Sequence, residues 1–110
     1  MEVKYYKKSS GRSPVEEFLE ECSSTLVKEY ADAFFALEAG EPLTMPLSRN
    51  LSSIYLGLHE LRLHDHFGQV RVFYYIRKQD AIYMIHACHK KTQKLPHREI
   101  DLIIKRIKEL

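Results

Sequence analysis

The sequence predicts an α+β fold: an antiparallel meander sheet with an N-terminal strand, two N-terminal helices and a C-terminal helix packed on it. Alternating apolar and polar residues over 56–63 and 70–77, followed by an apolar run over 81–88, indicate three strands joined by short turns. Short connections require antiparallel pairing, because a parallel pair needs a longer crossover. Apolar residues at helical spacing indicate two helices before this region and one after it. At 110 residues, the chain is expected to form a single domain over residues 1–110.

The first strand and the first helix have separate local signals. Residues 2–8 (EVKYYKK) are rich in β-forming residues and predict a strand. Ser13 is followed by Pro14 and, three residues on, by Glu16, which is a capping box with proline at the first helical position. A helix is therefore expected over residues 14–22.

A second helix is predicted over residues 25–39. Its apolar residues recur at helical spacing, and Gly40 is well placed to end it. The stripe comprises Leu26, Tyr30, Phe34 and Leu37. Residues 41–53 contain two prolines and show no period, so we interpret them as a crossing loop.

The three meander strands are expected over residues 56–63, 70–77 and 81–88. The sequence HDHFGQ offers a turn with Gly68 between the first two, and KQD (78–80) offers a short turn between the last two. Strict alternation in the middle strand assigns its faces. The core face holds Val70, Val72, Tyr74 and Ile76, and the opposite face holds Arg71, Phe73, Tyr75 and Arg77.

The last helix is expected over residues 96–109, with proline at its start. One apolar stripe would face the sheet, formed by Ile100, Ile103, Ile104 and Ile107.

The composition, 45% apolar and 29% charged, is ordinary for a globular chain. No apolar run approaches the roughly 18 residues of a membrane span, and the N-terminus lacks the apolar core of a signal peptide. We therefore expect a cytoplasmic protein without membrane contact. In that reducing setting, Cys22 and Cys88 are expected to be buried thiols and not a disulfide.

Charge is unevenly distributed along the chain. Residues 1–55 hold six Lys/Arg and nine Asp/Glu, whereas residues 56–110 hold eleven and six, together with all six histidines. A basic half favours a polyanionic partner, and nucleic acid is the obvious candidate. A split of this size is nevertheless common in proteins that bind nothing acidic.

Cations mark the ends of the predicted strands. Arg62 ends the first meander strand, Arg71 lies near the start of the next, and His89–Lys91 follows the third. In a meander these positions converge on one end of the sheet, with Lys94 nearby. Like charges brought together cost stability unless an anion lies between them. A phosphodiester fits, because arginine offers a fork to its oxygens and lysine a compact charge.

Each cation also has a plain structural explanation. Arg62 or Arg71 alone is more often a solvated residue or an ion-pair partner, and Glu60, on the face of Arg62, is a candidate partner. Lys90 and Lys91 could simply end and solubilise a strand. It is the convergence of these residues that favours a site.

Three aromatic side chains are further candidates. His89 suits proton transfer, although a histidine at the edge of an element is more often a structural hydrogen-bonding group. Tyr75 shares the face of Arg71 and could stack on a base or donate a proton. Phe73 could stack in the same way or pack under the last helix.

The sequence lacks a P-loop, a dinucleotide fingerprint, a G-x-S-x-G elbow and zinc-finger cysteine spacing. Its acidic residues do not cluster in the strands, so a two-metal carboxylate nuclease lacks ligands. A metal alternative would combine the pair His64 and His66 with the pair His86 and His89, with Asp65 adding an oxygen ligand. The first group lies in a turn and the second pair points to opposite strand faces, so no metal is expected.

With these residues identified, the chain resembles the RelE/HigB superfamily of bacterial toxins, specifically its phage-derived HigB-like branch. The matching segments are HELRL (59–63), VRVFYYI (70–76) and HACHKKTQKLPHREIDLIIKRI (86–107), with SPVEEFLEE and MPLSRNL before them. The order of elements in that fold matches the order predicted above.

The resemblance implies the toxin of a type II toxin–antitoxin pair: a metal-independent, ribosome-dependent mRNA endoribonuclease that inhibits translation. In such enzymes the ribose 2′-hydroxyl attacks its own 3′-phosphate, and no cofactor is needed. The implied partners are the ribosome, mRNA and a cognate antitoxin of helix-turn-helix type, with operator DNA contacted only through the antitoxin. The alternative is a non-catalytic, phage-derived RNA- or antitoxin-binding module of the same fold.

The resemblance also implies roles for particular residues. Arg62 and Arg71 would clamp the phosphate, and His89 or Tyr75 would transfer protons. Lys91, or else Lys90, would stabilise the transition state or donate to the leaving 5′-oxygen. The further RNA contacts expected are Lys94, Arg98, Phe73 and Arg77.

Overall fold

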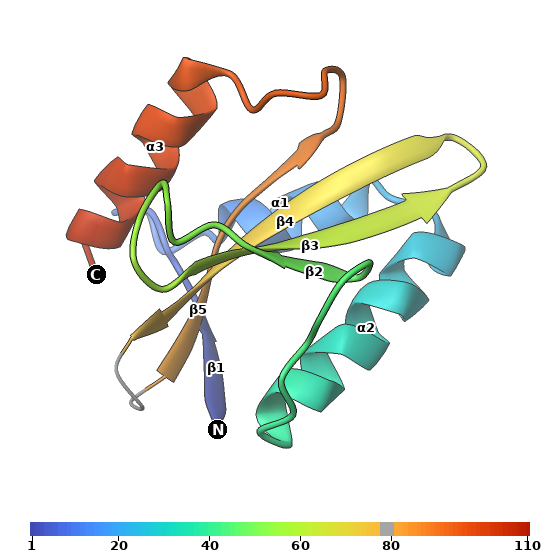
Figure 1. Ribbon diagram of the computed structural model, residues 1–110, viewed down its shortest axis with the longest axis horizontal. Coiled ribbons are helices and arrows are strands. Elements are labelled where there is room, and N and C mark those ends of the chain that lie inside the picture. Colours follow the sequence, from blue (N-terminus) through green and yellow to red (C-terminus); the bar gives the residue numbers. More distant parts are fainter. Residues whose placement is uncertain (78–80) are drawn as a thin grey trace.

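The computed structural model describes residues 1–77 and 81–110 (Figure 1). Its elements are β1 (Glu2–Tyr5), α1 (Pro14–Glu20), α2 (Ser24–Glu38), β2 (Ser48–Asn50), β3 (Leu58–Asp65), β4 (Gly68–Arg77), β5 (Ala81–His89) and α3 (His97–Lys108). The α+β class is confirmed, and every helix and strand expected from the sequence is present. The turn expected at 78–80 lies outside the described residues.

The strands formed by the described residues make one mixed sheet in the order β1-β5-β4-β3-β2. The antiparallel meander β3-β4-β5 is confirmed. The fully antiparallel sheet is wrong, however, because β1 pairs in parallel with β5. Two helices and three strands separate these two strands in the chain, so the connection is long enough for parallel alignment.

The segment interpreted as a loop contains the short edge strand β2, which pairs antiparallel with β3. All three residues of β2 are polar, and the last two are exposed, so the segment has no apolar period. The Ser48 side chain is buried and its hydroxyl lies 2.7 Å from that of Tyr74. The segment therefore forms a strand because it pairs with the free edge of β3, and not because its own residues favour a strand.

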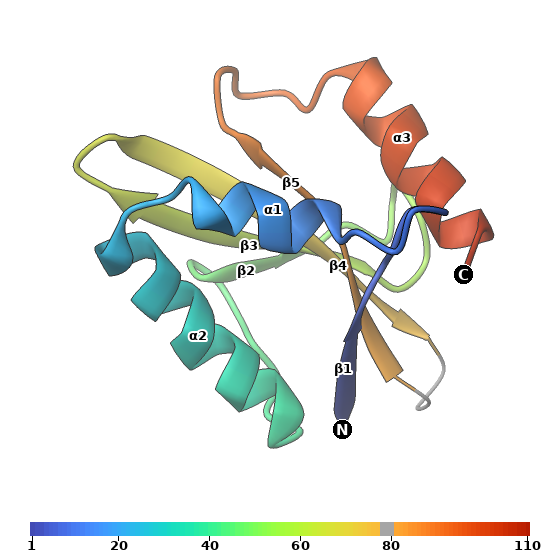
Figure 2. The ribbon, with the colours of Figure 1, turned by 180° about the vertical axis from the view of Figure 1, so that it is seen from behind.

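Helices cover both faces of the sheet. Helix α1 packs against β5, and α2 packs against β3 and β1, whereas α3 packs on the opposite face against β5 (Figures 1 and 2). The N-cap half of the predicted capping box is confirmed, because the Ser13 side chain accepts a hydrogen bond from the Glu16 backbone N–H at 3.3 Å. Among the described residues, no helix combines the length and apolar character that a membrane crossing requires.

Two apolar clusters fill the space between the sheet and its helices. The cluster under α1 and α2 includes Val15, Leu26, Leu37, Leu63, Val70, Val72 and Tyr74. The cluster under α3 includes Leu58, Phe73, Ile85, Ile103 and Ile107. The predicted assignment of the β4 faces is therefore confirmed.

A β-bulge in β5 decides which side chains reach the α3 face. Phe73 pairs with His86 and Tyr74 with Met84, so Ile85 is an extra residue between them. Ile85 and His86 consequently both face α3, where the imidazole of His86 contacts residues of that helix. Bulges are typically used to redirect a side chain in this way.

Candidate functional site

The two arginines predicted to converge are direct neighbours across the β3–β4 hairpin. Arg62 lies opposite Arg71 in the register of the two strands. Like charges at such positions are destabilising unless a third group compensates. Glu60 provides that compensation, because its Oε2 lies 2.9 Å from Nε of Arg71. From the sequence, Glu60 was a candidate ion-pair partner of Arg62. In the structure it contacts Arg71 diagonally across the strands.

The Arg71–Glu60 ion pair is buried, with 9% and 6% of the two side chains exposed. Nη2 of Arg71 also donates to the backbone carbonyl oxygens of Gln93, at 3.0 Å, and Thr92, at 3.5 Å. Arg71 thus fastens the segment between β5 and α3 to the sheet. Its guanidinium keeps the two N–H groups on Nη1 for a ligand, since the other three are directed at protein oxygens.

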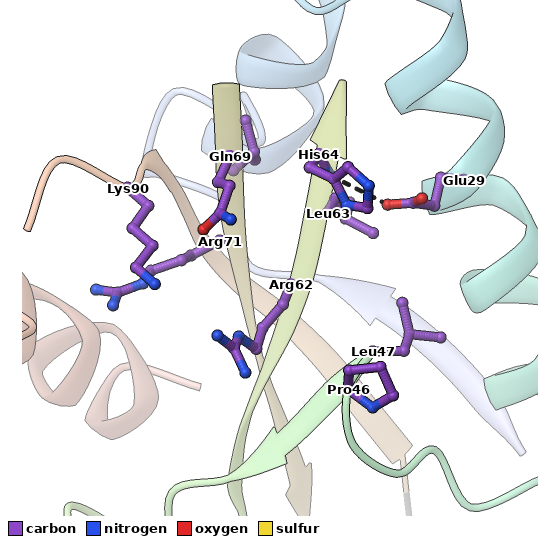
Figure 3. Close-up of a pocket in the computed structure, with 10 residues that line it drawn as sticks. Glu29, Pro46, Leu47, Arg62, Leu63, His64, Gln69, Arg71 and Lys90 are labelled. Carbon is purple, nitrogen blue, oxygen red and sulfur yellow. Dashed lines mark hydrogen bonds between the residues drawn. The ribbon is translucent and has the colours of Figure 1, made fainter. Parts of the chain in front are cut away.

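Lys90 joins the arginines from the end of β5. Its backbone N–H donates to the carbonyl oxygen of Gln69 at 2.9 Å, which extends the pairing of β5 with β4. Figure 3 shows the side chains of Arg62, Arg71 and Lys90 directed toward the same region beside the two strands. Among the described residues, no carboxylate forms an ion pair with Arg62 or Lys90.

These three cations line a cavity of about 320 Å³ at the end of the sheet (Figure 3). Its remaining lining comes from β3, β4, α2 and the segment before β2: Glu29, Pro46, Leu47, Leu63, His64, Gln69 and Val70. On the α2 side, the Glu29 carboxylate accepts a hydrogen bond from the His64 backbone N–H at 3.1 Å. Two unpaired cations beside a partly free guanidinium make the cavity suited to an anionic ligand.

The structure separates the other proposed catalytic residues from this cavity. His89 faces the opposite side of the sheet, where its ring lies 5.0 Å from that of Phe18 in α1. Lys91 is exposed in the segment after β5 and does not line the cavity. Tyr75 lies four residues along β4 from Arg71, which corresponds to about 13 Å, and contacts Tyr55 instead.

The four residues expected to contact RNA also differ in position. Phe73 is fully buried and packs in the core under α3, so it has no surface on which a base could stack. Arg77 contacts Tyr83, with Nη2 2.9 Å from the hydroxyl and the guanidinium over the ring. Lys94 and Arg98 are exposed, in the segment before α3 and in its first turn.

Sequence reasoning did not assign a role in the cavity to His64. It lines the cavity two residues after Arg62, so the two-residue period of a strand could have placed it on that face. A polar cluster beneath α3 was also not anticipated. It consists of His86, Glu99 and Arg106, with Cys88 beside it.

The hydrogen bonds of this cluster define the state of His86. Nη1 of Arg106 donates to Nδ1 of His86 at 3.1 Å and to the carbonyl oxygen of Ile85 at 3.0 Å. Nδ1 is therefore the acceptor, and Nε2–H donates to the Glu99 carboxylate. Burial lowers the pKa of His86, and the Arg106 charge lowers it further against the opposing effect of Glu99. His86 is accordingly neutral near pH 7.

One group of potential metal ligands occurs in the described part of the chain: His86, Cys88 and Glu99, with donor atoms within 4.8 Å of one another. These residues do not fit a metal ion. Nε2 of His86 carries a proton because Nδ1 accepts from Arg106. Burial raises the pKa of the Cys88 thiol to about 11, so the thiolate that a metal requires is scarce. We assign the cluster to the support of α3.

The fold and the cavity define a small α+β protein with a cationic cavity at the end of its sheet. A family model described as Phage derived protein Gp49-like (DUF891) matches residues 17–108. The match covers most of the chain, including every residue of the cavity, and the chain belongs to this phage-derived Gp49-like family. Among curated proteins no relative matches the chain.

Proposed function

We propose that this Gp49-like protein is the toxin of a type II toxin–antitoxin pair, an endoribonuclease that cleaves mRNA on the ribosome and thereby inhibits translation. The observation that carries the proposal is the convergence of Arg62, Arg71 and Lys90 on one cavity. Membership of a RelE-like family associated with toxin–antitoxin systems supports it. A separately encoded antitoxin of helix-turn-helix type neutralises the toxin and mediates any contact with operator DNA.

In the proposed reaction the ribose 2′-hydroxyl attacks the adjacent phosphorus, and the bond to the 5′-oxygen of the next nucleotide breaks. The products are a 2′,3′-cyclic phosphate and a 5′-hydroxyl, so the RNA supplies its own nucleophile. Arg62 and Lys90 stabilise the charge that develops on the phosphoryl oxygens. Lys90 donates a proton to the leaving oxygen, and His64 accepts the proton of the 2′-hydroxyl.

Arg71 has a different part in this proposal. Because it bonds Glu60 and two carbonyl oxygens after β5, it positions the segment that begins with Lys90. Its Nη1 N–H groups supply an additional contact to the phosphate. Lys91, Lys94 and Arg98 are exposed near this segment and act as general electrostatic contacts to the RNA backbone.

Induced expression in a bacterial host tests the proposal. The wild-type protein is expected to arrest growth and translation, whereas Arg62→Ala and Lys90→Ala are tolerated. Loss of one charge-stabilising donor typically lowers cleavage about 10²-fold. Lys28→Ala is the matched control, since Lys28 is an exposed lysine on α2 outside the cavity. Equal toxicity of all four proteins would place the active site elsewhere.

The chemistry is tested with purified protein, ribosomes and a defined mRNA. The 5′ fragment is expected to end in a 2′,3′-cyclic phosphate, detectable by mass spectrometry. An mRNA with a single 2′-deoxyribose at the cleavage position should bind but remain uncut there. Cleavage of that substrate at the unmodified rate would exclude attack by the 2′-hydroxyl.

A non-catalytic RNA-binding module is the second candidate, and one observation favours it. Three of the five guanidinium N–H groups of Arg71 are directed at protein oxygens, which limits the charge available for transition-state stabilisation. Tyr75 and His89, two expected proton-transfer groups, lie away from the cavity. Cosedimentation with ribosomes without any mRNA cleavage would support this candidate over the first.

A further inference from the structure

A second, wider cavity of about 570 Å³ lies on the sheet face opposite α3, between α1, α2 and β1. Figure 2 views the molecule from the side of these two helices. Its floor is aromatic. The rings of Tyr5 and Phe34 are stacked with their centroids 6.1 Å apart, and the ring centroids of Tyr30 and Phe34 lie 6.0 Å apart. The hydroxyl oxygens of the two tyrosines are 2.6 Å apart. Because the hydroxyls bond each other, the floor offers a preformed apolar surface.

Helix α2 has a second apolar stripe that no other part of the described chain covers. Its first stripe, which includes Leu26, Tyr30 and Leu37, is buried in the core. Val27, Ala31 and Phe35 follow a spacing of four residues along a neighbouring face and line the cavity. Phe35 is 74% exposed. One apolar stripe is enough to pack a surface helix, so a second one marks a contact surface.

The rim of this groove is acidic. Glu16 and Glu20 from α1 and Glu38 from α2 line it, and no lysine or arginine does. Such a rim repels RNA and anionic lipid. It also disfavours a second copy of this chain. A symmetric dimer through the groove would bring the two sets of carboxylates together, since each subunit presents the same patch.

We propose that this groove binds the apolar face of a basic amphipathic helix from a partner protein. Helix-in-groove recognition needs an apolar channel for side chains spaced at i, i+3, i+4 and i+7, which the stripe of α2 and the floor provide. The carboxylates pair with lysines or arginines that flank that face. The proposal does not rest on ribonuclease activity, because the groove and the cationic cavity share no residue.

Binding is measured with the full chain and a fluorescent helical peptide of about 18 residues, with leucines at that spacing and lysines elsewhere. The same peptide with glutamates in place of the lysines is the charge control. The lysine peptide is expected to bind and the glutamate peptide not to bind. Phe35→Ser should weaken binding about tenfold or more, and Glu20→Lys about threefold to tenfold.

Two variants outside the groove serve as matched controls. Leu56→Ser removes an even more exposed apolar side chain, 82% exposed, and Asp101→Lys reverses an exposed charge on α3. Both should retain wild-type affinity. The proposal is overturned if either control weakens binding as much as its groove counterpart, or if the glutamate peptide binds equally well. It is also overturned if the chain sediments as a dimer that Phe35→Ser converts to a monomer, because the occupant is then a second copy.

Discussion

The buried Glu60–Arg71 pair gives the sharpest prediction for stability. Glu60→Gln keeps the volume of the side chain and removes its charge, which leaves the Arg71 guanidinium buried without a counter-ion. Removing one partner of a buried ion pair typically costs about 3–5 kcal/mol. The two side chains are only 6% and 9% exposed, so water replaces the lost carboxylate only in part. Because the amide oxygen of glutamine still accepts one hydrogen bond, we expect a loss of about 3 kcal/mol.

Urea denaturation of the purified protein measures this loss. Asp32→Asn is the matched control, because the Lys28–Asp32 pair is exposed on α2 and its removal should cost less than about 0.5 kcal/mol. Arg71→Met should also be strongly destabilising, since it leaves Glu60 buried and unpaired. The double variant Glu60→Gln/Arg71→Met should lose less than the sum of the two, because neither charge then remains.

Two outcomes would refute this reasoning. A loss below about 1 kcal/mol for Glu60→Gln would mean that the guanidinium is solvated in solution. Additive losses in the double variant would mean that Glu60 and Arg71 do not interact energetically, despite the 2.9 Å contact.

Three further predictions concern pH, backbone geometry and metal ions. Burial lowers the pKa of His86 in the folded state, so stability should fall as the pH drops below about 6.5, where the unfolded chain gains a proton first. In denaturation curves, His86→Gln should make the free energy of unfolding depend less on pH, whereas His97→Gln, the exposed control, should leave that dependence as in the wild type. The same pH dependence in His86→Gln as in the control would contradict this prediction. Gly57→Ala should cost roughly 1–3 kcal/mol more than Gly11→Ala in urea denaturation. Both glycines have positive φ, but a Cβ on Gly57 would lie 2.7 Å from the Ile76 carbonyl oxygen, and equal losses would contradict this placement. Removal of transition metals with a chelator, at constant Mg²⁺ for the ribosome, should leave mRNA cleavage unchanged.

Elements with a strong period were predictable, and those defined by tertiary contacts were not. β3 and β4 alternate, and α3 has a continuous apolar stripe, so their existence and order follow from the sequence. The orientation of β1 depends on where two intervening helices return the chain, which no local pattern records. The bulge at Ile85 could not be predicted from the sequence for another reason. β5 is buried on both faces at most positions, so its apolar run shows no alternation from which an extra residue could be recognised.

In the candidate site, likewise, the contacts set by strand pairing were predictable and those set by tertiary packing were not. The pairing of Arg62 with Arg71 follows from a short hairpin, whose register fixes which residues are opposite. The diagonal contact of Glu60 with Arg71 depends on side-chain directions across two strands. The carbonyl oxygens of Thr92 and Gln93 reach Arg71 only because the segment before α3 folds back. Such contacts involve backbone atoms, which carry no residue-specific signal in a sequence.

The modest net charge of +2 conceals two surfaces of opposite sign. The acidic N-terminal half of the chain supplies α1 and α2, whose carboxylates form the rim of the groove. The basic C-terminal half supplies Arg62, Arg71 and Lys90, the cations of the cavity. The groove and the cavity share no lining residue, although α2 borders both of them, through Tyr30 and Glu29. The acidic rim therefore favours a basic partner and the cationic cavity favours an anionic one, each at its own lining.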